Sequence, residues 1–125
     1  PKKIVFTRGK NWDWITSDIQ DWIVVSNFPA PAHLKLNNIV VSEKNWKEEL
    51  AKNLLLLNIQ SVLIEGGKEI LELFLQNEFY NEIWEFSTSN ELNYGVDAPN
   101  LPINLILQNS DFSHKDSLRI LTPQP

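Results

Sequence analysis

The sequence contains no cysteine and no methionine, and neither basic nor apolar residues form long runs. The lack of cysteine excludes a disulfide framework, a thiolate metal site and a thiol nucleophile. Its 11 lysines and arginines are outnumbered by 16 aspartates and glutamates, so we expect no nucleic-acid partner. Apolar stretches such as Leu54–Leu57 are far too short to cross a bilayer, and the N-terminus has no apolar signal region. We therefore expect a cytoplasmic protein with no membrane partner.

What is present is enough for a folded domain. The chain has 125 residues, of which 42% are hydrophobic, so it can bury a core of its own. We expect a single domain over residues 1–125. The chain begins directly with a strand pattern and without an initiator methionine, so we also expect this domain to be partial, the C-terminal portion of a longer protein.

Strand patterns and helix patterns alternate along the chain. Apolar residues recur every three or four positions from Asn45 to Asn58 and from Gly67 to Asn77, which predicts two helices. Asn45 and Glu48 have the spacing of a capping-box pair at the start of the first helix. Ser61–Ile64 is apolar without alternation, as in a strand buried on both faces in a parallel sheet. The other predicted strands are Ile4–Thr7, Trp22–Val25, Ile39–Val41, Ile83–Ser87, Ile103–Gln108 and Ser117–Leu121. This order predicts an α/β fold whose last strands pair antiparallel.

The junction Glu65-Gly66-Gly67 connects the predicted central strand to the second helix. Glycine allows a sharp turn and lets a ligand approach the backbone without a Cβ in the way. A helix start presents unpaired N–H groups and the positive end of the helix dipole, which together favour a phosphate. Glu65 would then lie at the mouth of a crevice beyond the strand ends, where a carboxylate can hold substrate hydroxyl or amine groups. A Gly-Gly pair is also common in a tight turn that binds nothing, so both interpretations stay open here.

The junction belongs to a longer stretch that resembles a known family. Asn58–Gly67 (NIQSVLIEGG), the following helix with Leu71, and Phe79–Ile83 (FYNEI) resemble the C-terminal reductase domain of the bifunctional riboflavin-biosynthesis deaminase-reductases (RibD). The similarity is looser at Ile4–Thr7 and at Gly95–Leu101. It implies a dihydrofolate-reductase-like mixed sheet flanked by helices, with the N-terminal part of that fold absent from this chain.

The resemblance also implies an activity, the NADPH-dependent reduction of 5-amino-6-(5-phosphoribosylamino)uracil in riboflavin biosynthesis. The partner would be a small-molecule phosphoribosyl-pyrimidine substrate, contacted by the carboxylate of Glu65. The segment that lies along NADPH would comprise Gly66, Gly67, Lys68, Glu69, Ile70 and Leu71.

The sequence departs from the family at Ser89–Asn93, where the family has Pro-Lys-Leu-Leu-Gly. This departure leaves an alternative open, a non-catalytic binding or assembly module that retains the fold. An incomplete sheet would also expose an edge strand, across which a homodimer could form.

Other side chains that often serve in functional sites have simpler interpretations. His33 and His114 stand alone in predicted loops, without a second ligand at a useful spacing, so we expect no metal site. Trp12 and Trp14 flank an aspartate in a predicted loop, where they could cover a pocket or an oligomer contact. Three tryptophans lie on predicted apolar faces and are expected in the core: Trp22, Trp46 and Trp84.

Overall fold

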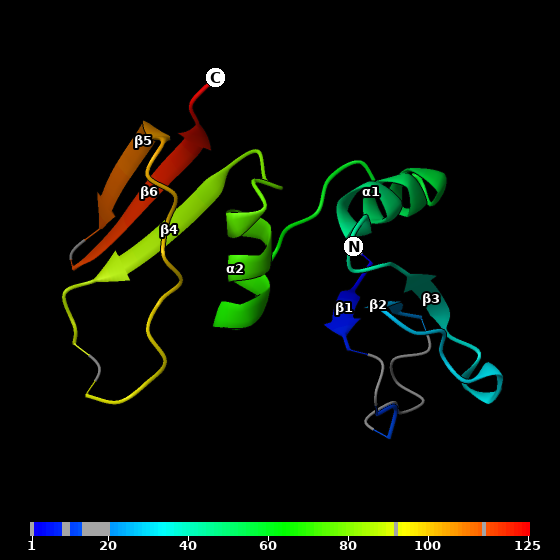
Figure 1. Cartoon of the computed structure of the whole chain (residues 1–125). Coiled ribbons are helices and arrows are strands. Elements are labelled where there is room, and N and C mark those ends of the chain that lie inside the picture. The colour runs from blue at the N-terminus through cyan, green and yellow to red at the C-terminus, as the bar shows by residue number, and fades with distance from the viewer. Residues whose placement is uncertain (1, 9–10, 14–20, 92, 114) are drawn as a thin grey trace. The chain divides into compact units, whose positions relative to one another are not determined.

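The computed structural model describes residues 2–8, 11–13, 21–91, 93–113 and 115–125 (Figure 1). The chain divides into two compact units, Pro1–Leu63 and Ile64–Pro125. The expectation of a single domain over residues 1–125 stays a prediction. In chain order the described elements are β1 (Ile4–Thr7), β2 (Ile23–Ser26), the 3-10 helix η2 (Ala32–Leu34), β3 (Asn37–Val40), α1 (Trp46–Leu56), α2 (Lys68–Gln76), β4 (Ile83–Thr88), β5 (Leu105–Ser113) and β6 (Asp116–Pro123).

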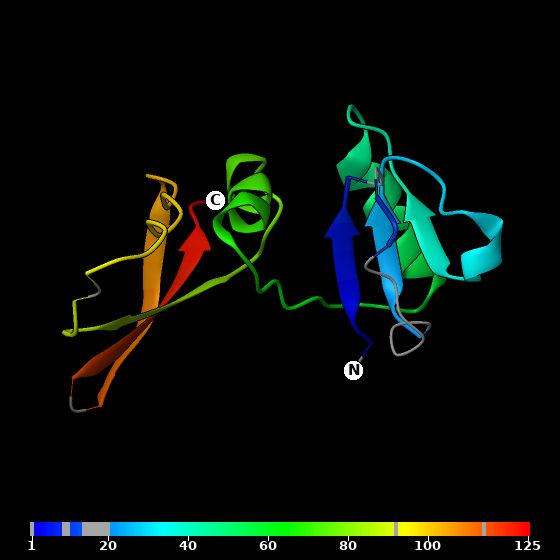
Figure 2. The same cartoon turned by 90° about the horizontal axis from the view of Figure 1, so that it is seen from below.

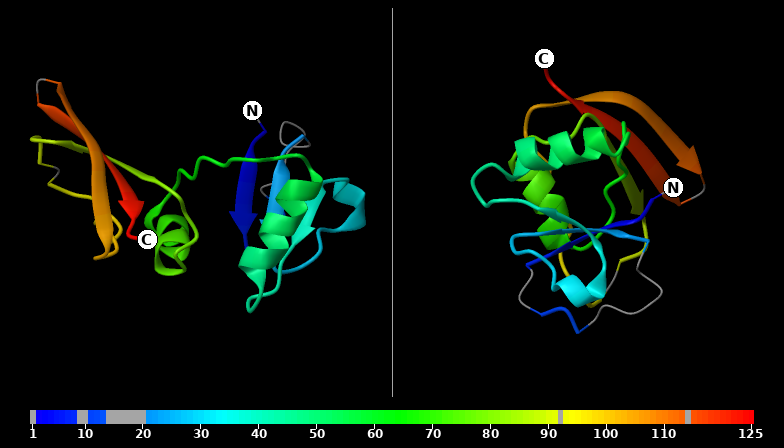
Figure 3. Two further views of the ribbon diagram at one scale, coloured as in Figure 1. Left: turned by 90° about the horizontal axis from the view of Figure 1, so that it is seen from above. Right: turned by 90° about the vertical axis from the view of Figure 1, so that its right-hand side faces the viewer.

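The first unit is built on a parallel sheet with the described strand order β1-β2-β3, whose arrows point the same way in Figure 2. All four residues of the middle strand β2 are buried, as in a parallel strand that is covered on both faces. Helix α1 lies along one face of the sheet (Figure 3) and places Leu50 in the core, where it is 2% exposed. The buried apolar residues of this unit are Ile23, Val24, Val25, Ile39, Val41 and Leu50.

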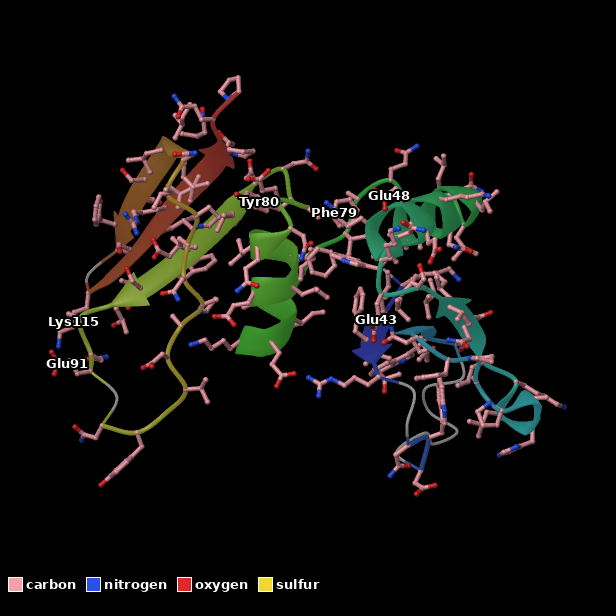
Figure 4. The ribbon with its side chains drawn as sticks, in the orientation of Figure 1. Glu43, Glu48, Phe79, Tyr80, Glu91 and Lys115 are labelled. Atoms are coloured by element: carbon pink, nitrogen blue, oxygen red, sulfur yellow. The ribbon has the colours of Figure 1, made fainter. Side chains whose placement is uncertain are left out.

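The start of α1 differs from the predicted capping box. Asn45 is the N-cap residue, but its side chain makes no capping hydrogen bond. Instead, the Glu49 carboxylate accepts hydrogen bonds from the Ser42 backbone N–H (2.6 Å) and the Ser42 hydroxyl (3.0 Å). The Ser42 oxygen in turn accepts one from the Asn45 N–H at 3.2 Å. The prediction for Glu48, which is exposed on α1 (Figure 4), is therefore wrong, because the preceding turn brings Ser42 to Glu49 instead.

The strand predicted at Ser61–Ile64 is not formed. Helix α1 ends at Leu56, and Asn58 has the left-handed φ of 57° expected of the residue that stops it. From there to α2 the chain forms neither helix nor strand, and Val62 and Leu63 are 41% and 82% exposed. An unalternating apolar run is stable as a strand only when neighbouring strands pair with it. Among the described residues this segment has no such neighbour, so the prediction of a central strand is wrong.

The second unit contains an antiparallel sheet with the described strand order β4-β6-β5, as predicted for the last strands. The pairing of β5 with β6 shifts register between Leu107 and Asn109, which marks a bulge in β5. Helix α2 buries Phe74 and Leu75, and the Phe74 ring stacks on Phe79 with 5.8 Å between the ring centroids. The apolar face predicted for the second helix is thus the one that packs.

Three tryptophans were expected in the core, and for Trp84 the structure contradicts this prediction. Trp84 on β4 is 56% exposed, and its indole N–H donates a hydrogen bond to the Glu82 carboxylate. Phe86, two residues further along the same face of the strand, is 72% exposed. Apolar side chains therefore alternate along β4 as the sequence predicts. The face that carries Trp84 and Phe86 is nevertheless exposed to solvent. Trp22 and Trp46 are half-buried.

Candidate functional site

The two glycines of the predicted junction have different structural roles. Gly66 has φ +158°, and a Cβ built on it would lie 2.5 Å from Ile70 Cγ2, closer than real Cβ contacts. Gly67 is the N-cap residue of α2 with φ −72° and ψ 167°, and a Cβ built there would meet no atom within 4 Å. Gly66 is therefore required by its close approach to the helix, whereas Gly67 borders open space.

The start of α2 next to Gly67 is suited to an anionic oxygen. No side chain caps this end of the nine-residue helix. Uncapped N–H groups and the helix dipole together favour a phosphate group at such a position. The positive charge of Lys68 is shared, because its ammonium lies 3.8 Å from the Glu72 carboxylate. Glu69 adds an acidic side chain to the same turn. The fit to a phosphate thus depends on the backbone and on the open space at Gly67.

The remaining predicted site residues lie on either side of these glycines. Ile70 and Leu71 are half-buried, and their backbone N–H groups donate to the Gly67 carbonyl at 3.1 and 3.3 Å. Glu65 is exposed, and among the described residues its carboxylate has no hydrogen-bond or ion-pair partner. Because the preceding segment forms no strand, Glu65 does not stand at a strand end as expected. The substrate role of Glu65 and the cofactor role of the turn remain predictions.

A concavity that was not predicted from the sequence lies within the second unit, beyond the end of α2. It has a volume of about 590 Å³, and Tyr80 is among its lining residues. Burial raises the pKa of Tyr80 above its usual value of 10.0, and the negative charge of Glu78 adds to this effect. Phe79 and Tyr80 lie just after α2, from which Asn77 and Glu78 separate them (Figure 4). That aromatic pair after a predicted helix end was the signal in the sequence that could have drawn attention to this region.

Other candidates contribute little to a site. His33 is exposed and Trp12 is half-buried. Within the described ranges, no group of three or more histidine, aspartate or glutamate side chains could hold a metal ion. None of the described helices has the length and apolarity needed to cross a membrane. Three residues discussed above lie outside the described residues: Trp14, Leu92 and His114.

No protein-family model and no curated protein matches the chain. Solved structures do match. The chain is 21% identical to the diaminohydroxyphosphoribosylaminopyrimidine deaminase/5-amino-6-(5-phosphoribosylamino)uracil reductase of Thermotoga maritima, with a TM-score of 0.74 over 99% of this chain and 38% of that one. For Acinetobacter baumannii RibD the identity is 19% and the TM-score 0.77, over 99% of this chain and 38% of that one. For the riboflavin biosynthesis reductase Rib7 of Saccharomyces cerevisiae the identity is 17% and the TM-score 0.77, over 100% of this chain and 70% of that one.

The chain has the fold of these reductases. The mixed α/β fold and the resemblance to the RibD reductase domain, both expected from the sequence, are thereby confirmed at the level of the fold. The chain spans 38% of the length of the Thermotoga maritima and Acinetobacter baumannii proteins.

Proposed function

We propose that this chain contributes to the NADPH-dependent reduction of 5-amino-6-(5-phosphoribosylamino)uracil in riboflavin biosynthesis, in the cytoplasm. One observation carries the proposal. The turn Glu65-Gly66-Gly67, which begins an uncapped helix, occurs in a chain that follows the fold of riboflavin-biosynthesis reductases over nearly its whole length. The substrate is taken from the Thermotoga maritima protein, which is described as a reductase of this compound.

The residues at the turn fit the cofactor in chemical terms. Gly67 leaves the backbone open to a ligand, and the uncapped start of α2 offers N–H donors to a phosphate oxygen of NADPH. Gly66 and the first helical turn through Leu71 would line the same ligand. When bound, the cofactor supplies the hydride. Glu65 would orient a hydroxyl or amine group of the phosphoribosyl-pyrimidine. The chain would thus hold substrate and cofactor next to each other in the geometry for hydride transfer and exclude water.

A second candidate function, a non-catalytic binding or assembly module, is favoured by one observation. Glu65 is exposed and has no partner among the described residues, and the segment before it is not anchored in a sheet. A substrate-contacting carboxylate must be held to within about 0.5 Å by the residues around it. In this chain by itself nothing described holds Glu65 in that way.

Calorimetric titration with NADPH tests the proposal on the unmodified chain and on two variants, Gly67→Asp and Gly67→Asn. Both variants add a side chain of the same size into open space, and both residues are better helix N-caps than glycine, so both should fold. Only aspartate places a negative charge where the phosphate should lie. Either side chain can accept a hydrogen bond from the N–H groups that the phosphate would use, so we expect Gly67→Asn to bind NADPH more weakly than the unmodified chain. We expect Gly67→Asp to bind at least about tenfold more weakly than Gly67→Asn, because only aspartate adds charge repulsion.

The other outcomes are informative as well. Equal binding by all three proteins would place NADPH away from this turn. No binding by any of them would contradict a cofactor site in this chain and favour the non-catalytic module.

A further inference from the structure

The concavity beyond the end of α2 is built from segments that are far apart in the sequence. Strands β4 and β5 both pair antiparallel with β6, so these two strands begin where β6 ends (Figure 1). Beyond these strand ends, the backbone N–H of Gln124 donates to the Asn104 carbonyl at 3.1 Å. The residues that line the concavity all belong to Ile64–Pro125. The second unit therefore forms the concavity by itself.

Part of the lining is apolar. Leu75 is 8% exposed, and Leu101 and Pro102 are half-buried. The volume of about 590 Å³ lies within the range of small-molecule sites, which combine apolar walls with a few polar groups. The concavity thus has room for a compact apolar body such as an aromatic ring.

The polar part of the lining carries a negative charge and no positive one. Glu78 is among the lining residues, whereas none of the described residues that line the concavity is a lysine, an arginine or a histidine. Within the described part of the chain, the Glu78 carboxylate has no hydrogen-bond or ion-pair partner. Its charge acts on the phenol of Tyr80, whose pKa it raises in addition to burial, so the two side chains lie close together. This lining favours a cation over an anion.

The end of α2 adds to this preference. The backbone N–H groups of Glu78 and Phe79 donate to carbonyls further back in the helix. No described donor reaches the carbonyl of Gln76, which is the last residue of α2 and lines the concavity. Unpaired carbonyl oxygens and the negative end of the helix dipole favour a cation at such a position. The ring of Tyr80 can attract the same cation through its face.

We propose that this concavity binds a small primary ammonium ion with an apolar body, of the arylalkylamine class. The three N–H donors of the ammonium would be shared between the Glu78 carboxylate and the Gln76 carbonyl. The hydrocarbon part would pack against the apolar wall at Leu101 and Pro102. A phosphate or carboxylate ligand would instead meet the charge of Glu78 without a compensating cation.

This site is separate from the turn at which we place the cofactor. It lies at the opposite end of α2 from Gly67, about 14 Å away along a helix of nine residues. The proposal does not rest on the reductase function, because amine binding and NADPH binding are measured separately and either can fail without the other.

An NMR titration of the ¹⁵N-labelled full chain at pH 7 tests the proposal with two probes, benzylamine and benzyl alcohol. The two compounds have nearly the same size, and only the amine is charged. We expect benzylamine to cause saturable shifts of the amide signals of Gln76, Asn104 and Gln124, while those of Gly66 and Gly67 stay in place. We expect benzyl alcohol to bind at least about tenfold more weakly, because it lacks the charge that Glu78, the helix end and Tyr80 would stabilise.

The same titration contradicts the proposal in either of two cases. One is the absence of a saturable shift at the lining residues with benzylamine. The other is an equal affinity for the two compounds, which would mean that the concavity takes up the ring and does not recognise the ammonium.

Two charge-removing variants locate the interaction. Glu78→Gln keeps the size of the side chain and removes its charge. Glu91→Gln is the matched control, because Glu91 is also exposed and belongs to the same unit, but follows the opposite end of β4 from Tyr80 (Figure 4). We expect Glu78→Gln to bind benzylamine at least about threefold more weakly, as is usual for an exposed ion pair, and Glu91→Gln to bind it as the unmodified chain does.

Circular dichroism checks that both variants fold like the unmodified chain. An unchanged affinity of Glu78→Gln would overturn the role of its carboxylate. An equal loss in both variants would show that the amine responds to the net charge of the chain and not to this site, and would overturn the proposal as well.

Discussion

At the scale of single residues, Gly66 and Gly67 should respond differently to the same substitution, because a Cβ would meet a neighbour at Gly66 and open space at Gly67. We expect Gly66→Ala to lower the free energy of unfolding by about 1–3 kcal/mol, because the new methyl group would lie 2.5 Å from Ile70 Cγ2. Gly67→Ala enters open space and loses only a small N-cap preference, so we expect a change of about 0.5 kcal/mol. Urea denaturation followed by circular dichroism measures both values.

A double-mutant cycle identifies the cause of the Gly66 effect. Ile70→Ala removes the atom with which the new methyl group collides, so Gly66→Ala should cost less in that background than in the unmodified chain. The same cost in both backgrounds would mean that the backbone conformation of Gly66, and not the contact with Ile70, is responsible.

Tyr80 is the residue for which we predict a pH effect. Its pKa is raised above 10.0, first by burial and then by Glu78, so folding favours the neutral phenol. The resulting stability is fully present below pH 10 and is lost as the pH rises through the pKa of the folded state. The chain has two tyrosines, so in a Tyr94→Phe variant the phenolate absorbance reports on Tyr80 alone. We expect a titration midpoint above 10.0 in the folded protein, and at the ordinary value in urea.

At the scale of secondary-structure elements, α1 is held mainly through one buried side chain. Leu50 is 2% exposed, whereas Leu55 on the same helix is 70% exposed. We expect Leu50→Ala to lower the free energy of unfolding by about 2–5 kcal/mol, because it leaves a cavity in the core. Leu55→Ala should change it by no more than about 0.5 kcal/mol. If urea denaturation shows similar losses for the two variants, α1 does not pack through the face that carries Leu50.

The start of α1 is stabilised by a residue that precedes the helix and lies outside the predicted capping pair. The sequence supplies several residues able to cap the helix, and the predicted pair at Asn45 and Glu48 fits the usual spacing. The structure uses Ser42 and Glu49 instead, seven residues apart, because the turn after β3 folds back onto the helix. Local spacing predicted that the helix begins here, and the preceding turn selected the side chains that stabilise it.

At the scale of the whole molecule, charge and exposed apolar surface act in opposite directions. The net charge is −5 at pH 7 and the isoelectric point lies near 4.9, so copies of the chain repel one another at neutral pH. We expect turbidity to be greatest near pH 4.9, where this repulsion vanishes and exposed side chains such as Leu63 and Phe86 can associate. Light scattering from pH 4 to 8 measures this, and a flat profile would show that apolar exposure does not govern association.

Much of the architecture could be predicted because it depends on local patterns. The strand Ile4–Thr7 was predicted with its observed bounds, and the helix stop at Asn58 has the left-handed backbone expected of it. The antiparallel pairing of the last strands followed from their order along the chain. The motif from Asn58 to Ile83 indicates the reductase fold from the sequence alone. Hydrophobic periodicity and turn residues are properties of neighbouring positions, so the amino-acid sequence by itself determined these features.

Other features depend on which segments meet in three dimensions, and only the tertiary structure decided them. Ser61–Ile64 is as apolar as a buried strand, yet it forms none because no described strand pairs with it. Trp84 follows the alternation of β4, yet no residue that the structure describes covers it well enough to bury it. Gly66 and Gly67 are the same residue in sequence, and the structure gives them different backbone conformations and different surroundings. A sequence pattern indicates which side chains a segment can bury and whether the segment can pair as a strand. Whether other segments cover those side chains or pair with that strand is decided only by the tertiary structure.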